Sequence, residues 1–194
     1  MALNKGLFKR PFHLCPSKGY ATVCLFFLFL SVHASTQPRP TGEYQLKAAF
    51  IYNFIRFIDW PSGSFGGGES PFVIGVLSDD VISAHINELV RGEKLGSRPI
   101  VVRKFNNPGE ISQCHILFIG GQDVSQMKSL IHGMNRRGIL TVSDAPNFAK
   151  MGGIVRFYKE ANKLRLQINV DEAKISELTI SSKLLSLSNI YKAN

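Results

Sequence analysis

Two adjacent carboxylates, Asp79 and Asp80, are the side chains of this sequence whose position most favours chemistry. They follow an apolar run at residues 72–77, and ligands of α/β proteins bind beyond the carboxyl ends of parallel strands. An acid pair there suggests the metal site of a receiver domain. That site also needs a phosphate-accepting Asp at the end of the third strand, where residues 118–121 are FIGG. Two carboxylates also repel phosphate, which argues against the phosphate cradle of a flavodoxin. The sequence therefore favours an ordinary helix cap at Asp79 or Asp80.

The other candidates for catalysis or metal binding stand alone in the sequence. His85, His115 and His132 have no second ligand at helix or hairpin spacing, which argues against a metal site. There is no GxSxG elbow, and Cys114 has no plausible local base beside it. We therefore expect no catalytic residue, no metal and no cofactor.

The segment at residues 143–153 is the most distinctive candidate for binding. It combines turn formers, an aromatic residue and a Gly pair, directly after a predicted strand, at the edge where α/β folds keep their sites. The candidate binding-loop residues are Ser143, Asp144, Phe148, Gly152 and Gly153. The alternative is a plain crossover into the next strand, and the sequence does not decide between the two.

An alternation of strand-like and helix-like segments must position these residues. Continuous apolar runs predict strands at residues 72–77, 99–105, 115–119 and 139–142. Capping signals predict helices that start at Asp79 or Asp80 and at Asp123, and that end at Gly92 and Gly138. Residues 154–158 and 164–170 predict an antiparallel hairpin, followed by a short helix from Asp171 and a closing segment at residues 180–190. We expect a three-layer α/β fold with a mostly parallel central sheet, a flavodoxin-like order of elements and a C-terminal antiparallel hairpin.

The apolar residues between positions 43 and 60 recur at a spacing of three and four, which predicts a helix over residues 43–60. Ile51, Tyr52 and Ile55 widen its apolar stripe beyond what one core face needs. A helix that is apolar nearly all round is either buried on several sides or shared with another chain. We expect these three residues to form an interface, while the glycines at residues 62–68 make a mobile loop.

The first residues predict export. Lys5, Lys9, Arg10 and Lys18 form a basic opening without acids, followed by the apolar run at residues 21–32. This is the layout of a secretory signal peptide. Small residues two apart predict cleavage after Ala34, which makes residues 1–34 the signal peptide and residues 35–42 a polar linker. The alternative is an uncleaved anchor, but the run is shorter than the roughly 20 residues that span a bilayer.

Cleavage would leave a chain of 160 residues with 19 basic and 14 acidic side chains, a net charge of +5. The basic residues are scattered, so we expect no nucleic-acid partner. Residues 43–190 fit a single domain. Cys114 would then be the only cysteine, either as a reactive thiol or as a small buried hydrophobe, and its place beside a strand favours burial.

Six blocks of this sequence resemble the YfiR family of exported bacterial proteins, in the family's order. The blocks are LKAAFIYNFIRFIDWP (46–61), PFVIGVLSDD (71–80), RPIVVRKF (98–105), CHILFIG (114–120), GILTVSDAPNFAKMGG (138–153) and INVDEAKISELTISSKLLSLS (168–188). The resemblance covers nearly the whole chain after the predicted cleavage site. It implies a periplasmic protein without known catalysis.

The resemblance also implies a role and partners. Relatives repress an inner-membrane diguanylate cyclase by binding its periplasmic portion, and a peptidoglycan-associated outer-membrane lipoprotein releases them. They are dimers stabilised by disulfides, which the lone Cys114 cannot reproduce. We expect a periplasmic regulatory protein, a homodimer that binds a diguanylate cyclase or a similar membrane sensor. The alternative is a periplasmic small-ligand-binding or sensing module that acts with a transporter or sensor kinase, and an unrecognised hydrolase has the least support.

Overall fold

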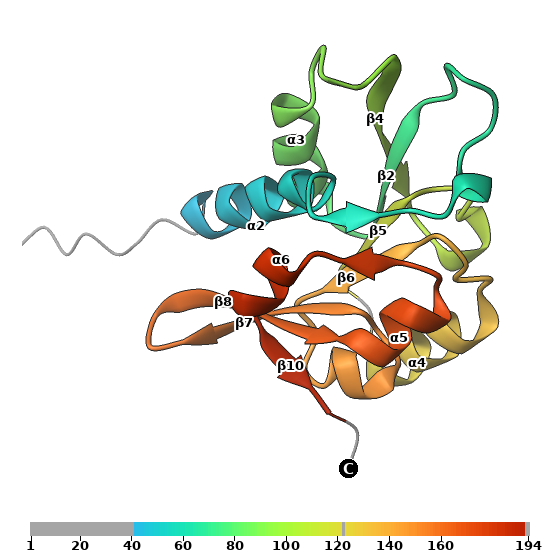
Figure 1. Ribbon diagram of the computed structural model, residues 1–194. Coiled ribbons are helices and arrows are strands. Elements are labelled where there is room, and N and C mark those ends of the chain that lie inside the picture. Colours follow the sequence, from blue (N-terminus) through green and yellow to red (C-terminus); the bar gives the residue numbers. More distant parts are fainter. Residues whose placement is uncertain (1–40, 122, 193–194) are drawn as a thin grey trace, which may run out of the picture. The chain divides into compact units, whose positions relative to one another are not determined.

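The computed structural model describes residues 41–121 and 123–192 (Figure 1). An eight-stranded sheet runs in the order β10-β8-β7-β6-β5-β2-β4-β3. Its strands are β2 (Phe72–Leu77), β3 (Lys94–Leu95), β4 (Arg98–Phe105), β5 (Ile116–Ile119), β6 (Leu140–Ser143), β7 (Val155–Glu160), β8 (Lys163–Asn169) and β10 (Asn189–Tyr191). A separate pair joins β1 (Ile58–Asp59) and β9 (Thr179–Ile180). The helices are α2 (Thr41–Phe54), α3 (Asp80–Leu89), α4 (Val124–Gly133), α5 (Val170–Ile175) and α6 (Ser182–Ser186), with 3-10 turns at Ser62–Ser64, Pro108–Glu110 and Phe148–Met151.

The central part of the sheet is parallel. Strands β4, β2, β5, β6 and β7 pair in parallel, while β3 and β8 add antiparallel partners and β10 runs parallel to β8. The predicted α/β class, the mostly parallel sheet and the antiparallel β7–β8 hairpin are confirmed. Among the four connections that join the central strands β2, β4, β5, β6 and β7, two contain a helix (α3 or α4) and the other two contain only 3-10 turns.

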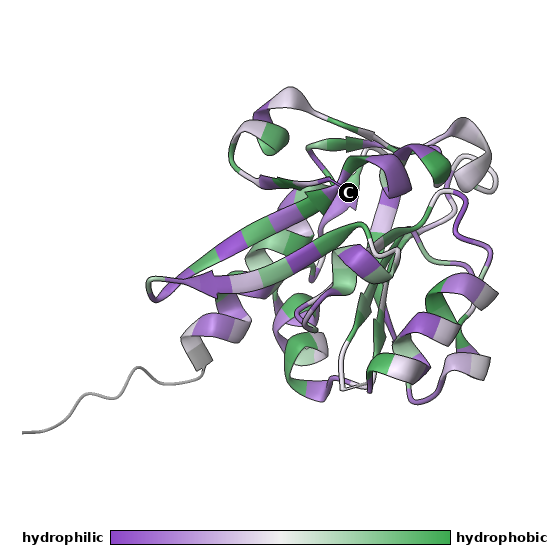
Figure 2. Ribbon diagram, turned by 90° about the horizontal axis from the view of Figure 1, so that it is seen from below, coloured by the Kyte–Doolittle hydropathy of each residue, from purple (hydrophilic) through white to green (hydrophobic). Residues whose placement is uncertain are grey.

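The central strands alternate their side chains between two apolar cores. Phe72, Ile74 and Val76 of β2 belong to the larger core, and Val73 and Leu77 belong to the smaller one. The larger core also takes the buried faces of α2 and α3, and the smaller core takes that of α4. Figure 2 shows this apolar character along the central strands, and it shows the alternation of polar and apolar residues along the β7–β8 hairpin.

Side-chain caps start the helices where the sequence predicts them. The Asp79 carboxylate accepts a hydrogen bond from the Ile82 N–H (3.0 Å), and the Asp123 carboxylate accepts one from the Gln126 N–H (2.9 Å). Each cap satisfies one of the backbone N–H groups that a helix start leaves without a partner. Asp79 therefore has a capping role, as expected from the sequence.

Several predicted boundaries are wrong. Helix α2 begins inside the predicted linker, at Thr41, and ends at Phe54 rather than at residue 60. The chain then turns, and Ile58 pairs with Ile180 in the small sheet. Helix α4 ends at Gly133 because Met134 takes an extended conformation, so Arg136 and Arg137 lie beyond the helix. The hairpin turn is also tighter than expected, since Ala161 and Asn162 both have positive φ and form a two-residue turn.

None of the helices in the described part of the chain is long and apolar enough to cross a bilayer. The predicted signal peptide, its cleavage after Ala34 and most of the predicted linker lie outside the described residues. The described fold is one compact unit from residue 40 onward.

Candidate functional site

The predicted binding loop at residues 143–153 is mostly packed into the fold. The Ser143 hydroxyl donates to the Ile119 carbonyl (2.7 Å) and accepts from the Ala145 N–H (3.1 Å). The Phe148 side chain is fully buried, and a Cβ at Gly153 would overlap its ring. Gly152 is buried too, with a positive φ of 96° at the end of the 3-10 turn. Of the five candidate residues, the structure therefore exposes only Asp144 to a partner.

Asp144 belongs to a network of ion pairs that connects this loop to α2. We call this network, formed by Glu43, Lys47, Asp144 and Lys159, the charged clasp. Lys47 is almost completely buried, and its ammonium contacts the Asp144 carboxylate at 2.6 Å and the Glu43 carboxylate at 2.8 Å. Burial alone would lower the pKa of Lys47, but hydrogen bonds to Asp144 and Glu43 outweigh it, and the pKa is raised. Glu43 also contacts Lys159 of β7 at 2.5 Å, and this hydrogen bond is the main reason that the pKa of Glu43 is lowered. Because every charge in the clasp has an opposite partner, its role is to fix α2 against the sheet.

The structure corrects the predicted interface on α2. Ile51 has no exposed surface and Ile55 is 7 % exposed, so both are core residues. The apolar stripe is wide because this helix packs against neighbours on several sides. Burial on several sides is the alternative to an interface for a helix that is apolar nearly all round. Tyr52 is half-buried, and its hydroxyl donates to the Glu93 carboxylate (2.9 Å) beyond α3, a contact that raises the pKa of Tyr52. Ile51 and Ile55 cannot present an interface in this fold.

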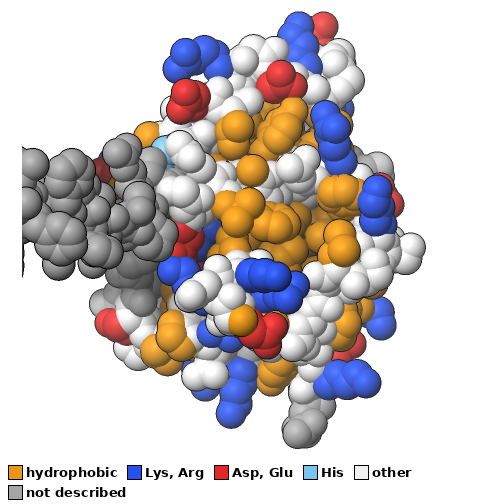
Figure 3. All heavy atoms as spheres, turned by 90° about the vertical axis from the view of Figure 1, so that its left-hand side faces the viewer, with side chains coloured by type: hydrophobic (Ala, Val, Ile, Leu, Met, Phe, Trp, Pro, Cys, Tyr) orange, Lys and Arg blue, Asp and Glu red, His pale blue; other side chains and the backbone are white. Residues whose placement is uncertain are grey.

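A different set of apolar side chains lies at the surface beside the charged clasp. Hydrophobic side chains gather on the face that α2 and the β7–β8 hairpin present at the left of Figure 1, as the space-filling view shows (Figure 3). On α2, Leu46 is 46 % exposed and Phe50 is half-buried against Phe157 of β7 (ring centroids 6.0 Å apart). We define the α2 face by the partly exposed residues Leu46, Phe50 and Leu164. Contiguous apolar surface of this kind marks interaction sites.

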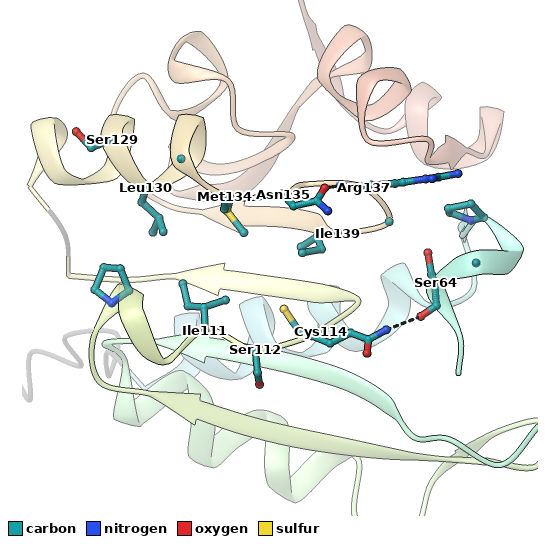
Figure 4. A pocket seen from close by; sticks show the side chains of 16 residues that line it. Ser64, Ile111, Ser112, Cys114, Ser129, Leu130, Met134, Asn135, Arg137 and Ile139 are labelled. Carbon is teal, nitrogen blue, oxygen red and sulfur yellow. Dashed lines mark hydrogen bonds between the residues drawn. The ribbon is translucent and has the colours of Figure 1, made fainter. Parts of the chain in front are cut away.

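A cleft of about 750 Å³ lies at the opposite ends of the strands from the predicted loop. It is bounded by residues 61–64, by residues 108–114 before β5, by the second half of α4 and by residues 133–139 before β6 (Figure 4). These segments precede β5 and β6, so the cleft lies at the amino ends of the parallel strands. Its volume is in the range of small-molecule sites. The rule that places sites at carboxyl ends could not find it, and its hydroxyl, amide and aliphatic lining forms no sequence motif.

His115 holds one wall of this cleft. Its ring is buried and stacks against both Phe65 and Phe72, with ring centroids 4.9 and 4.6 Å away. Nδ1 accepts a hydrogen bond from the Val73 N–H (3.0 Å), so the ring is neutral and Nε2 donates to the Ser64 carbonyl at 3.1 Å. Burial lowers the pKa of His115, and the positive charge of Arg98 acts in the same direction. Because both ring nitrogens bind the backbone, His115 is a structural residue and not a free base.

The glycine-rich loop that was predicted to be mobile is fixed from two sides. The Arg98 guanidinium donates to the Gly67 carbonyl (2.8 Å) and to the Ser70 carbonyl (3.0 Å), and it lies over the Phe65 ring. His115 holds the other end of the loop at Ser64. The cleft wall is therefore preformed.

Lowering the pH from about 7 to about 5.5 is expected to reduce the free energy of unfolding, by at most ~1.4 kcal/mol for each pH unit. In this window an unfolded His115 takes up a proton near its ordinary pKa of 6.5, whereas the folded ring, whose pKa is lowered, resists protonation. The stability that depends on neutral His115 is thus complete above pH 6.5 and is lost as the pH falls below it. Urea unfolding at both pH values measures the effect. His115→Gln should flatten the dependence; an equal slope in the variant and in the wild type would contradict the assignment.

Cys114 is buried, as the sequence favoured. It is 3 % exposed, its sulfur packs over Gly75, and burial raises the pKa of its thiol to about 12. A thiol with this pKa is almost entirely protonated at neutral pH and is a poor nucleophile. The described residues also contain no cluster of three metal-ligating side chains.

Comparison with known protein families identifies a match for this chain. Residues 44–189 match the family model described as YfiR/HmsC-like. A search of curated proteins finds no match. The matched range begins in α2 and ends at the first residue of β10, so it contains the α2 face, the cleft and all of the charged clasp except Glu43.

Proposed function

Since the chain belongs to the YfiR/HmsC-like family, we propose that it is a periplasmic repressor of an inner-membrane diguanylate cyclase, which it binds through the periplasmic portion of that enzyme. The family suggests a periplasmic regulator of cyclic-di-GMP signalling in general. The family match over residues 44–189 is the observation that carries the proposal, because it spans nearly all of the described fold.

A binding role rather than catalysis agrees with the chemistry of the reactive side chains. The buried Cys114 thiol, with a pKa of about 12, is not a nucleophile at neutral pH. His115 uses both ring nitrogens for the backbone, and Asp79 caps α3. The side chains with the best prospects for chemistry therefore hold the fold together.

The α2 face is the surface that we propose for the membrane partner. Leu46 and Phe50 offer apolar area at its centre, and the ion pair of Glu43 with Lys159 lies beside them. Apolar side chains surrounded by charged ones are typical of protein interfaces. The clasp at Lys47 keeps this surface rigid, which lowers the entropy cost of binding. A second copy of the chain in a homodimer, or an outer-membrane lipoprotein that releases repression, would use this face or compete for it.

Leu46→Glu is expected to weaken capture of the cyclase by more than tenfold and to raise cyclic-di-GMP and biofilm in cells. A glutamate at a site that becomes buried on binding leaves an unpaired charge in the interface, which costs several kcal/mol. The measurement is a pulldown from membranes with the purified protein, followed by quantification of cyclic-di-GMP. Size determination in solution shows whether the same change dissociates a homodimer.

Val124→Glu is the matched control, because Val124 is 59 % exposed on α4, which packs on the other core. Both variants should keep the wild-type unfolding midpoint. If Leu46→Glu captures the cyclase as well as Val124→Glu does, the α2 face is not the docking surface. If the wild-type protein captures no diguanylate cyclase and its deletion leaves cyclic-di-GMP unchanged, the proposed function is wrong.

A further inference from the structure

The cleft at the amino ends of β5 and β6 has an apolar middle. Leu130 of α4 and Met134 just beyond its end lie on one wall together with Ile139, and Ile111 and the sulfur of Cys114 lie on the opposite wall (Figure 4). The two walls belong to the smaller core, which continues beneath them. An apolar body that enters between these walls would cover side chains that the fold leaves partly exposed, and such burial is favourable.

One end of the cleft is polar. Arg137, Asn135 and Ser64 lie together at that end, away from Ser129 at the other (Figure 4). This end is narrow because Gly138, with a positive φ of 68°, comes so close to Ser64 that a Cβ at position 138 would overlap the Ser64 hydroxyl. The Ser64 carbonyl is already held by His115 and by the Gln113 amide (3.3 Å). The polar end is thus formed before any ligand arrives.

The side chains that line the cleft carry positive charge only. Arg137 is the lining cation, and the described lining contains no Asp or Glu. Arg103 stands behind Ser112 and Gln113, with its guanidinium 3.4 Å from the Ser112 hydroxyl and 3.5 Å from the Gln113 carbonyl. Arg137 has only one acidic partner at the surface, Glu177 (2.8 Å), and both side chains are well exposed. Such exposed pairs are weak, so a ligand anion can compete for the guanidinium.

We propose that this cleft binds a small organic anion with an apolar body, the anionic group at Arg137 and Asn135 and the body between the α4 wall and Ile111. The size of the cleft, its apolar middle and its single cationic end each select for this class of ligand. The site lies at the other ends of the strands from the loop at residues 143–153 and is separate from the α2 face. It gives the regulator a small-molecule input that does not require the membrane partner.

The test uses two dyes with the same skeleton, anilinonaphthalene sulfonate and the uncharged N-phenylnaphthylamine. The protein is the full chain after export, without the predicted signal peptide at residues 1–34. We expect saturable fluorescence enhancement with one sulfonate site per chain in the cleft. Leu130→Trp, which places a larger side chain between the two walls from α4 (Figure 4), should remove this site for both dyes. Arg137→Gln should weaken the sulfonate by roughly fivefold to tenfold and leave the uncharged dye within twofold.

Gln126→Trp is the matched control, because Gln126 is exposed on the same helix but does not line the cleft. Binding is compared only among variants that keep the wild-type unfolding midpoint, so that loss of the fold is not mistaken for loss of the site. Sulfonate binding that Leu130→Trp leaves unchanged would overturn the site. An Arg137→Gln protein that binds both dyes as the wild type does, or loses both equally, would overturn the assignment of an anion.

Discussion

Replacing Ile51 by glutamate is expected to unfold most of the protein. Ile51 has no exposed surface and lies in the larger core with Phe54 and Ile58. The substitution removes a packed aliphatic side chain and buries a carboxylate. The cation one turn earlier on the helix, Lys47, is already paired with Asp144 and Glu43, so the new charge costs several kcal/mol. A domain of this size has a total stability of only about 5–15 kcal/mol. Circular dichroism and urea unfolding measure the loss.

Leu46→Glu serves as the control for this prediction. It introduces the same side chain five positions earlier on the same helix, where the native residue is 46 % exposed. Its unfolding free energy should stay within about 0.5 kcal/mol of the wild type, as is usual for surface substitutions. If Ile51→Glu unfolds cooperatively at the wild-type midpoint, α2 does not pack in the core as the structure has it.

The same helix shows where sequence reasoning stops. Apolar spacing predicts that α2 is a helix and that it is apolar on more than one side, and both are correct. The apolar pattern cannot distinguish a helix that packs against several neighbours in its own fold from a helix that contributes an apolar stripe to an interface with another chain. Ile51 and Ile55 look alike in both cases, and only the position of the neighbouring elements shows that they are core.

The strands were easier to predict than the ends of the helices. Residues 72–77 are a continuous apolar run, and β2 has these bounds because it is buried on both faces. The predicted end of α4 at Gly138 is wrong because long-range contacts, and not helical hydrogen bonds, hold the residues between Gly133 and Gly138. Arg136 binds the Gly152 carbonyl (2.9 Å) and the Glu172 carboxylate (2.6 Å), and neither contact leaves a local signal in the sequence.

The cleft escaped prediction for a related reason. Its lining comes from three separate segments of the chain, and none of them carries a motif. Residues such as Ile111 and Ile139 come to face each other only when α4 packs beside β5 and β6. The general rule for α/β proteins also directed attention to the carboxyl ends of the strands, where residues 143–153 turn out to be largely buried.

Phe148→Ala is expected to lower the free energy of unfolding by about 3–5 kcal/mol, the usual cost of removing a buried aromatic side chain. Phe148 has no exposed surface, and its ring lies in the smaller core against Gly153. If residues 143–153 formed a binding loop with an aromatic anchor at its surface, the same change would leave stability nearly unchanged and would instead reduce binding. Urea unfolding of the purified protein distinguishes a crossover packed into the core from an exposed loop.

A double-mutant cycle with Gly153 sharpens this prediction, because a Cβ at position 153 would overlap the Phe148 ring. Gly153 does not have a positive φ, so Gly153→Ala acts by collision with the ring and not by backbone strain. Alone, Gly153→Ala should destabilise the protein, since the buried ring has no space to move. In the Phe148→Ala background the same methyl group fills part of the cavity. The double variant should therefore lose less unfolding free energy than the sum of the two single variants, by about 0.5–3 kcal/mol. Additive costs would mean that ring and glycine do not touch, and the tight packing of this crossover would be refuted.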